Sequence, residues 1–239
     1  MKIFFGKNPL IDFSFERELL SKGIDETLIL ISRWKEKYLI LGYAQDFSGI
    51  DREEAQKNGV KVFRRSSGGT AVLSTDSINI SLFIPSAHPF AKPIEELYKA
   101  FLETLKDAFG EIGRDVEISK IKEKINSPIC FLSQSGETLL VDGKKFFGGA
   151  QTRNKNVLLV HGTLLLEFDP ILHSKIFGVD QSLLEQKIAS IDIDSDLFTK
   201  QAVKSFQKTL QSKTVAPPKI ASPSAQFIKQ TQTPKWMPK

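Results

Sequence analysis

The sequence is poor in cysteine and has no long apolar run. Its single cysteine, Cys130, excludes an intramolecular disulfide and a zinc site built from several thiolates, so this residue serves either packing or reactivity. No apolar stretch approaches the roughly 18 residues of a membrane helix, and residues 1–6 carry too short an apolar region for a signal peptide. We therefore expect a protein that stays in the cytoplasm and contacts no membrane.

The last part of the chain lacks acidic residues. From Lys213 onward there are five lysines and no Asp or Glu, so of the 33 basic residues 28 remain to balance the 28 acidic residues of the rest. The pI of about 9.1 therefore reflects this tail and does not indicate a nucleic-acid-binding face. Because the tail is also rich in Pro, Ser, Thr and Gln, we expect a catalytic domain over residues 1–212 and a basic, proline-rich, disordered tail over residues 213–239.

The remaining composition is that of a globular domain. A chain of 239 residues, 41% of them apolar, can bury a sizeable core and is most simply one domain. Apolar residues at helical spacing predict one helix that ends at Gly23 and another that starts at Pro93 and ends at Gly110. The pair Asp142-Gly143 between two apolar runs predicts a tight β-hairpin.

Further apolar segments predict strands. Residues 27–34 and 38–44 flank a charged turn and predict a hairpin, while residues 70–73 and 78–84 predict a second strand pair. Residues 157–168 predict a longer strand. Because the strands are short and joined mainly by turns, the pattern indicates an α/β (α+β) protein with a mixed, largely antiparallel sheet flanked by helices.

The first motif with chemical meaning is the segment Arg64-Arg65-Ser66-Ser67-Gly68-Gly69. Adjacent glycines permit positive φ and let the main chain approach a ligand closely, and successive amides in such a turn can bind phosphate or carboxylate. The two arginines add charge and forked donors that suit the same groups. A solvated hairpin turn with flanking arginines explains the same residues, so this segment identifies an anion-binding site only together with a second motif.

A second motif lies far along the chain. It consists of Gly143-Lys144-Lys145, then Gly148-Gly149-Ala150-Gln151, then His161-Gly162-Thr163. Strand alternation puts Lys145, Gly149 and Gln151 on one face and Lys144 on the other, so only one lysine of the pair points inward. We expect this to be Lys145.

Taken in order, the two motifs resemble the lipoate-protein ligase and octanoyltransferase superfamily over roughly residues 30 to 170. The resemblance implies the catalytic fold of the biotin and lipoate ligases. Ser74 and Thr75 stand where many members of the superfamily have a His-Asp pair, so no role of that histidine is transferred.

The resemblance also implies which residues act. Cys130 precedes Lys145 by fifteen positions, as in octanoyltransferases that carry the acyl group on a cysteine, although a lone cysteine in an apolar run is otherwise an inert core residue. We expect Cys130 and Lys145 to be catalytic and to lie within hydrogen-bond reach of each other. The expected substrate-binding residues, around one acyl tunnel that also includes Leu73, are Arg33, Arg64, Arg65, Ser67, Gly68, Gly69, Gly148, Gly149, Ala150, Gln151, His161, Gly162 and Thr163.

The function implied is transfer of an octanoyl or lipoyl group from acyl-carrier protein through Cys130 to a lysine of a lipoyl domain or of the glycine-cleavage H protein. This reaction needs no cofactor, and no metal site is expected. The main alternative is an ATP-dependent lipoate-protein ligase that uses ATP and Mg and forms lipoyl-adenylate. A remote third alternative is a non-catalytic acyl-binding or nucleic-acid-binding module, supported only by the basic tail.

Overall fold

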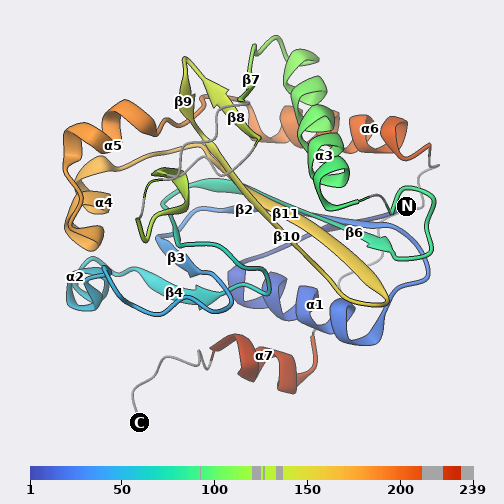
Figure 1. Ribbon diagram of the computed structural model, residues 1–239, viewed down its shortest axis with the longest axis horizontal. Helices are drawn as coiled ribbons and strands as arrows, with labels where there is room; N and C mark the ends of the chain where they lie inside the picture. Colours follow the sequence, from blue (N-terminus) through green and yellow to red (C-terminus); the bar gives the residue numbers. More distant parts are fainter. Residues whose placement is uncertain (92, 120–124, 126, 133–136, 212–222, 233–239) are drawn as a thin grey trace.

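The structure is a computed structural model that describes residues 1–91, 93–119, 125, 127–132, 137–211 and 223–232 (Figure 1). Its strands are β1 (Lys2–Phe5), β2 (Leu28–Trp34), β3 (Tyr38–Leu41), β4 (Lys61–Arg64), β5 (Val72–Ser74), β6 (Ser77–Pro85), β7 (Glu117–Ser119), β8 (Thr138–Val141), β9 (Lys144–Lys145), β10 (Phe147–Arg153) and β11 (Val157–Leu165). Its helices are α1 (Pro9–Lys22), α2 (Arg52–Lys57), α3 (Ile94–Gly110), α4 (Pro170–Phe177), α5 (Gln181–Lys187), α6 (Ser195–Thr209) and α7 (Ala225–Gln232), with a 3₁₀ turn, η1, at Cys130–Leu132.

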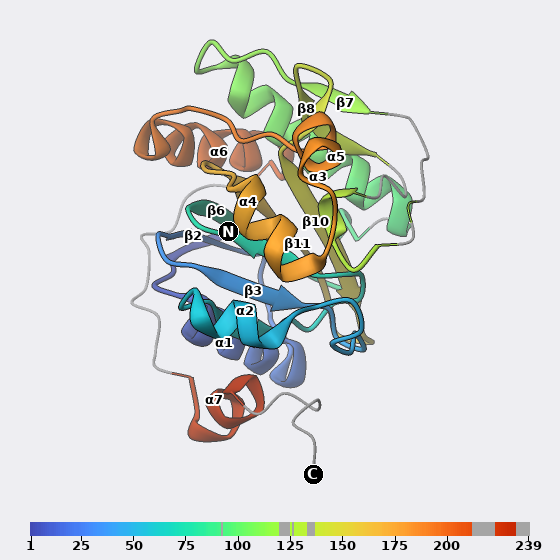
Figure 2. The ribbon, with the colours of Figure 1, turned by 90° about the vertical axis from the view of Figure 1, so that its left-hand side faces the viewer.

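A five-stranded sheet in the order β1-β2-β6-β11-β10 forms the centre of the molecule. Only the β1–β2 pair is parallel, which confirms the predicted mixed, largely antiparallel sheet. Helices α3 and α6 cover one face and α1 lies against the other (Figures 1 and 2). Between the sheet and α3–α6, the rings of Phe109 and Phe198 stack at 4.5 Å and anchor the larger core.

The predicted hairpin of residues 27–34 and 38–44 is wrong. Strand β2 pairs with β1 and β6 in the central sheet, whereas β3 pairs with β4 and β5 in a separate three-stranded sheet. Both strands are buried along almost their whole length, and such strands require neighbours on both edges. The charged turn between them is therefore a crossing from one sheet to the other. The predicted pair 70–73 and 78–84 divides in the same way into β5 and β6.

The predicted hairpin at Asp142-Gly143 is present. It joins β8 to β9, and both turn residues have positive φ, 50° and 73°, as a two-residue hairpin turn requires. After β9 the chain leaves this small sheet at Phe146 and enters the central sheet as β10. Because Phe146 and Phe147 are both fully buried, side-chain alternation breaks at this point.

The helix ends follow the signals in the sequence. Gly23 caps α1 with φ 82°, and the Asp51 side chain caps α2 by accepting a hydrogen bond from the Glu54 amide. Helix α3 begins directly after Pro93, as predicted. In the described part of the chain, none of the helices combines the length and apolarity that crossing a bilayer demands.

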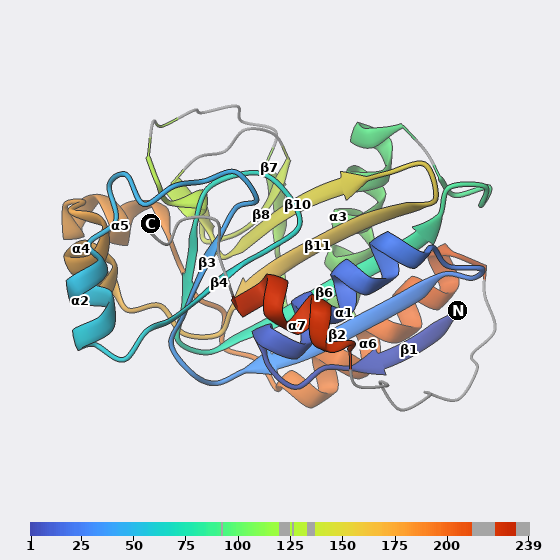
Figure 3. The same ribbon diagram turned by 90° about the horizontal axis from the view of Figure 1, so that it is seen from below.

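Part of the tail that we expected to be disordered is folded. Helix α7 packs on the outer side of α1, as the view from below shows (Figure 3). Ser14 of α1 lies 3.0 Å from Thr231, whose side chain is fully buried, and the Ser224 amide donates to Glu18. Amphipathic spacing around Phe227 and Ile228 explains this docking, which the polar composition of the tail concealed. The rest of the expected tail lies outside the described residues.

Candidate active site

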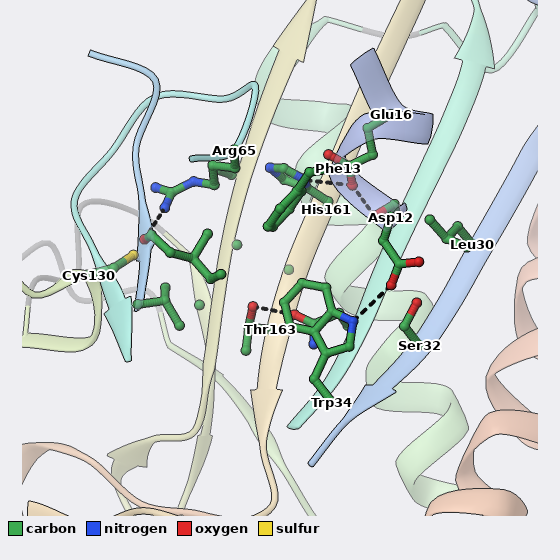
Figure 4. Close-up of a pocket in the computed structure, with 18 residues that line it drawn as sticks. Asp12, Phe13, Glu16, Leu30, Ser32, Trp34, Arg65, Cys130, His161 and Thr163 are labelled. Carbon is green, nitrogen blue, oxygen red and sulfur yellow. Dashed lines mark hydrogen bonds and ion pairs between the residues drawn. The ribbon is translucent and has the colours of Figure 1, made fainter. Parts of the chain in front are cut away.

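A pocket lies between α1 and the strands β10 and β11 of the central sheet (Figure 4). Both sequence motifs contribute to its lining, although Arg65 and His161 are almost a hundred residues apart. The predicted residues that line it are Arg65, Cys130, Gly148, Gly149, Ala150, His161, Gly162 and Thr163. The two glycine-containing motifs therefore meet in one site.

Cys130 is held at the pocket by main-chain pairing on both sides. Ile129 forms a parallel bridge with Ala71, the Cys130 amide donates to the Ala71 carbonyl at 2.8 Å, and η1 follows. The side chain is half-buried and lines the pocket. Since Ala71 directly follows the first glycine motif, this bridge brings the thiol next to that motif.

Lys145 is the inward-pointing lysine, as strand alternation predicted, with only 5% of its surface exposed. Its Nζ donates to the main-chain carbonyl of Cys130 at 2.9 Å and lies 5.6 Å from the centre of the Phe131 ring. Burial lowers the pKa of Lys145, and a negative charge on Cys130 acts in the opposite direction. Lys145 thus contacts Cys130 through the main-chain carbonyl of the cysteine, and the expected approach of the two side chains stays a prediction.

The two arginines bind the protein's own main chain, which the sequence did not predict. Arg65 donates through Nη1 to the Ile40 carbonyl, through Nη2 to the carbonyls of Gly68 and Thr70, and through Nε to Ser67 Oγ. Its guanidinium therefore shapes the Gly68-Gly69 turn from inside. Gly69 has φ 90°, which favours glycine at this position.

Arg64 lies outside the pocket lining. Its Nη1 donates to the carbonyls of Gly42, Tyr43 and Gln45 at 2.5 to 3.0 Å. Arg64 therefore does not lie around the pocket as expected: the carbonyls of the loop that follows β3 engage its Nη1, whereas its Nε makes no hydrogen bond within the described residues.

Arg33 is a second correction. On β2 the side chain of Trp34 faces the pocket, so strand alternation turns Arg33 to the opposite, solvent-facing side. There Arg33 forms an ion pair with Asp76 at 2.7 Å and donates to Ser195. The predicted residue therefore supports the protein surface, and its neighbour Trp34 lines the pocket.

Gln151 and Leu73 also lie outside the pocket lining. Gln151 is half-buried on β10, one position beyond the pocket-lining Ala150. Leu73 is fully buried in the core around β3, and the adjacent Val72 lines the pocket in its place. Ser67, Gly68 and Gly69 do not line the pocket either; Ser67 bonds to Arg65 and His161, and the Gly68 carbonyl bonds to Arg65.

A sequence profile of the lipoyl protein ligase A/B catalytic domain matches residues 8–213. The chain belongs to this family. The octanoyltransferase LipM of Brevibacillus brevis is 32% identical over 228 residues, covering 86% of this chain and 83% of the relative. The octanoyltransferase LipM of Staphylococcus aureus is 29% identical over 203 residues, covering 78% and 73% of the two chains. The superfamily expected from the motifs is therefore confirmed.

Solved structures of this family share the fold. A lipoate-protein ligase A bound with ATP superposes with a TM-score of 0.77 at 18% identity, covering 96% of this chain and 92% of that chain. A putative lipoate protein ligase from T. acidophilum with bound lipoic acid gives a TM-score of 0.75 at 17% identity, covering 96% and 93%. At these identities the likeness concerns the fold alone.

Two buried acids of the site were not predicted. Asp12 and Glu16 lie one helical turn apart on α1, so both face the pocket, where they are 2% and 1% exposed. Asp12 accepts from the Trp34 indole at 2.8 Å, and its burial raises its pKa. The sequence did contain a signal for this pair of acids. Asp12 and Glu16 are four residues apart on the side of the helix that carries Phe13, and acids are rare on an apolar helix face.

Proposed function

We propose that this family member is an octanoyltransferase that carries the acyl group on Cys130 and delivers it to a lysine of a lipoyl domain or glycine-cleavage H protein. The observation that carries this proposal is the position of Cys130: its side chain lines the pocket, and Nζ of Lys145 donates a hydrogen bond to its main-chain carbonyl. The names of the relatives agree, since both are octanoyltransferases. The proposed donor is octanoyl acyl-carrier protein.

In the first half-reaction, Lys145 accepts the thiol proton of Cys130, a task for which burial favours its neutral form. The sulfur then bonds to the thioester carbonyl carbon, and the carbon–sulfur bond to the carrier's pantetheine arm breaks. The departing sulfur takes the proton back from Lys145. This leaves an acyl-enzyme on Cys130 and a free carrier thiol.

In the second half-reaction, the amine of the acceptor lysine attacks the acyl carbon on Cys130. An amide forms, the bond to sulfur breaks, and the amine's surplus proton returns to the thiol by way of Lys145. The main-chain amides near Gly148 and Gly149 are our candidates to stabilise the oxyanion in both halves, a contribution of about 3 kcal/mol where such donors are well placed.

The pocket offers the acyl chain an apolar wall next to the cysteine. Phe13, Trp34, Ile40 and Val72 line it, and burying each methylene stabilises the complex by about 0.8 kcal/mol. Because the thiol must remain reduced between turnovers, we place the reaction in the cytoplasm. The reaction requires no added cofactor.

The ATP-dependent ligase is the second candidate, and the hydrogen bonds of Arg64 and Arg65 disfavour it. A ligase needs donors for the phosphates of ATP, yet the Nη1 of Arg64 and the N–H groups of Arg65 are largely occupied by main-chain carbonyls and Ser67. The site thus fits a thioester donor better than a triphosphate. We therefore place ATP and Mg outside the reaction.

Intact-mass spectrometry tests the proposal. The protein is mixed with octanoyl acyl-carrier protein, and in a second tube with lipoate, ATP and Mg. We expect a covalent octanoyl adduct in the first tube and transfer to a lipoyl domain added afterwards. Lipoylation of the domain in the second tube alone, without an adduct in the first, would establish the ligase instead.

A further inference from the structure

Arg65 is a buried cation that contacts only neutral groups. It is 6% exposed, and within the described residues its hydrogen-bond partners are Ser67 Oγ and three main-chain carbonyls. Among the described residues, no carboxylate forms an ion pair with it. Burial lowers its pKa because the charged form loses hydration. A charge in this position needs an opposite charge nearby to persist.

A chain of hydrogen bonds leads from Arg65 to such a charge. Arg65 Nε donates to Ser67 Oγ at 3.0 Å, Ser67 Oγ lies 2.6 Å from His161 Nε2, and His161 Nδ1 lies 3.1 Å from Glu16 Oε1. A carboxylate can only accept, so Nδ1 carries a hydrogen. In the tautomer with its hydrogen on Nδ1, the ring accepts at Nε2 from Ser67 Oγ. Each member therefore donates to the next, from Arg65 to Glu16.

Glu16 is the acid suited to this role. It is 1% exposed, its Oε1 also accepts from Ser81 at 2.6 Å, and its charge favours the charged form of Arg65. Asp12, the other acid in the pocket, is engaged by Trp34 and Lys7, and burial favours its neutral form. In Figure 4 the acids and Cys130 lie on opposite sides of the pocket, with His161 between them.

We infer that Glu16 is a positioning residue for acyl transfer: through His161 and Ser67, its carboxylate balances Arg65 and holds that guanidinium, charged, on the side of the pocket that carries Cys130. There the guanidinium stabilises negative charge on the sulfur and on the oxyanion as they form. Within the described residues, four N–H groups of Arg65 bind the protein, so one N–H on Nη1 is available for the reacting groups. This inference rests on the proposed transfer through Cys130.

The substitution Glu16→Gln tests the negative charge of Glu16 separately from its hydrogen bonds. Its amide oxygen still accepts from His161 and Ser81, so the hydrogen-bond pattern survives while the negative charge is lost. At saturating octanoyl acyl-carrier protein, we expect the rate of acyl-enzyme formation to fall roughly tenfold to hundredfold, as for other partners that orient a functional group from behind. The dissociation constant of the donor should change less than about twofold.

The matched control is Glu18→Gln. Glu18 lies on the same helix, contacts Lys22 near the surface and is not part of the pocket, so we expect the wild-type rate. Ser67→Ala provides a second disruption, since it breaks the chain while leaving both charges in place. It should slow acyl-enzyme formation in the same way as Glu16→Gln. Urea unfolding of each variant identifies any that fails to fold.

A double-mutant cycle separates positioning from a merely structural role. If Glu16 acts through Arg65, Glu16→Gln should add little further loss in an Arg65→Gln background, whereas independent structural effects would multiply. Failure of the wild type to form an acyl-enzyme overturns the proposed function itself. A wild type that forms the adduct, with Glu16→Gln equally fast or with losses that multiply in the double mutant, overturns only the role of Glu16.

Discussion

Nζ of Lys145 donates a hydrogen bond to the main-chain carbonyl of Cys130 at 2.9 Å, so the side chain of the proposed base is fixed to the residue that carries the nucleophile. The two belong to different elements, β9 and η1, and this bond joins the lysine directly to the residue that carries the thiol. Burial suits Lys145 to act as the base, and its position in the pocket lining suits Cys130 to act as the nucleophile.

The first prediction concerns the nucleophile. Cys130→Ser keeps the shape of the side chain but replaces the thiol with a hydroxyl, a far weaker nucleophile at neutral pH. We expect the acyl-enzyme to disappear in intact-mass spectra and turnover to fall by roughly a thousandfold or more. Since Cys130 is the only cysteine, no other thiol can replace it. Full activity of the serine variant with lipoate and ATP would favour the ligase.

The second prediction concerns the buried lysine. Lys145→Met removes the base and should abolish transfer, but it also removes a buried amine, so we expect the free energy of unfolding to remain equal or to rise by about 1 kcal/mol. The control is Lys144→Met, because Lys144 is the less buried of the pair. Urea unfolding and transfer assays measure both effects. An inactive Lys144→Met variant would contradict the assignment of roles.

Much of the fold could be predicted because its signals are local. The glycine after α1 and the Asp142-Gly143 turn act through their own main chain, and both behave as predicted. Strand pairing is not local. Nothing in residues 27–44 shows that β2 and β3 belong to different sheets, because the partners on their other edges come from distant segments.

Site residues that belong to sequence motifs could be predicted, whereas site residues that are recognisable only by their burial were missed. Cys130, Lys145 and His161 belong to recognisable segments: Cys130 and His161 line the same pocket, and Lys145 contacts the Cys130 carbonyl. The sequence around Glu16 is typical of a surface helix, and only the packing of distant elements buries this residue. Arg33 was predicted to bind substrate, but the register of its strand places it at the surface, where it pairs with Asp76. Such properties depend on packing between distant segments, which a single sequence does not display.

The third prediction concerns acid stability. His173 is buried in α4, and its burial lowers its pKa from the ordinary 6.5 to about 4. The unfolded chain therefore binds a proton that the folded chain rejects, so stability is fully present above about pH 6.5 and falls as the pH drops toward 4. The shift corresponds to a loss on the order of 3 kcal/mol.

Urea unfolding at pH 7.5 and at pH 4.5 measures this effect. We expect His173→Gln to be less stable than the wild type at neutral pH, because Nδ1 of the histidine bonds to the Asp169 carbonyl, but to lose less stability between the two pH values. If the variant and the wild type lose the same amount, other groups cause the acid sensitivity.

The last prediction concerns Gly162, which lines the pocket between His161 and Thr163. A Cβ at this position would lie 2.0 Å from Cζ of Phe147, and that ring is fully buried against Phe101, at 6.2 Å between centroids. Because the ring has little room to retreat, Gly162→Ala should lower the free energy of unfolding by about 1 to 3 kcal/mol.

Gly110→Ala is the matched control for this substitution. Gly110 ends α3, nothing lies within 4 Å of its added Cβ, and its φ is not positive, so the methyl group meets no obstacle. Alanine also restricts the unfolded chain, and we expect a gain of about 0.5 kcal/mol or no change. Equal stability of the two alanine variants would show that Phe147 yields to the methyl group. Because the strand bearing Gly162 also carries His161, acyl transfer by the Gly162→Ala variant should be slower even where the protein is fully folded.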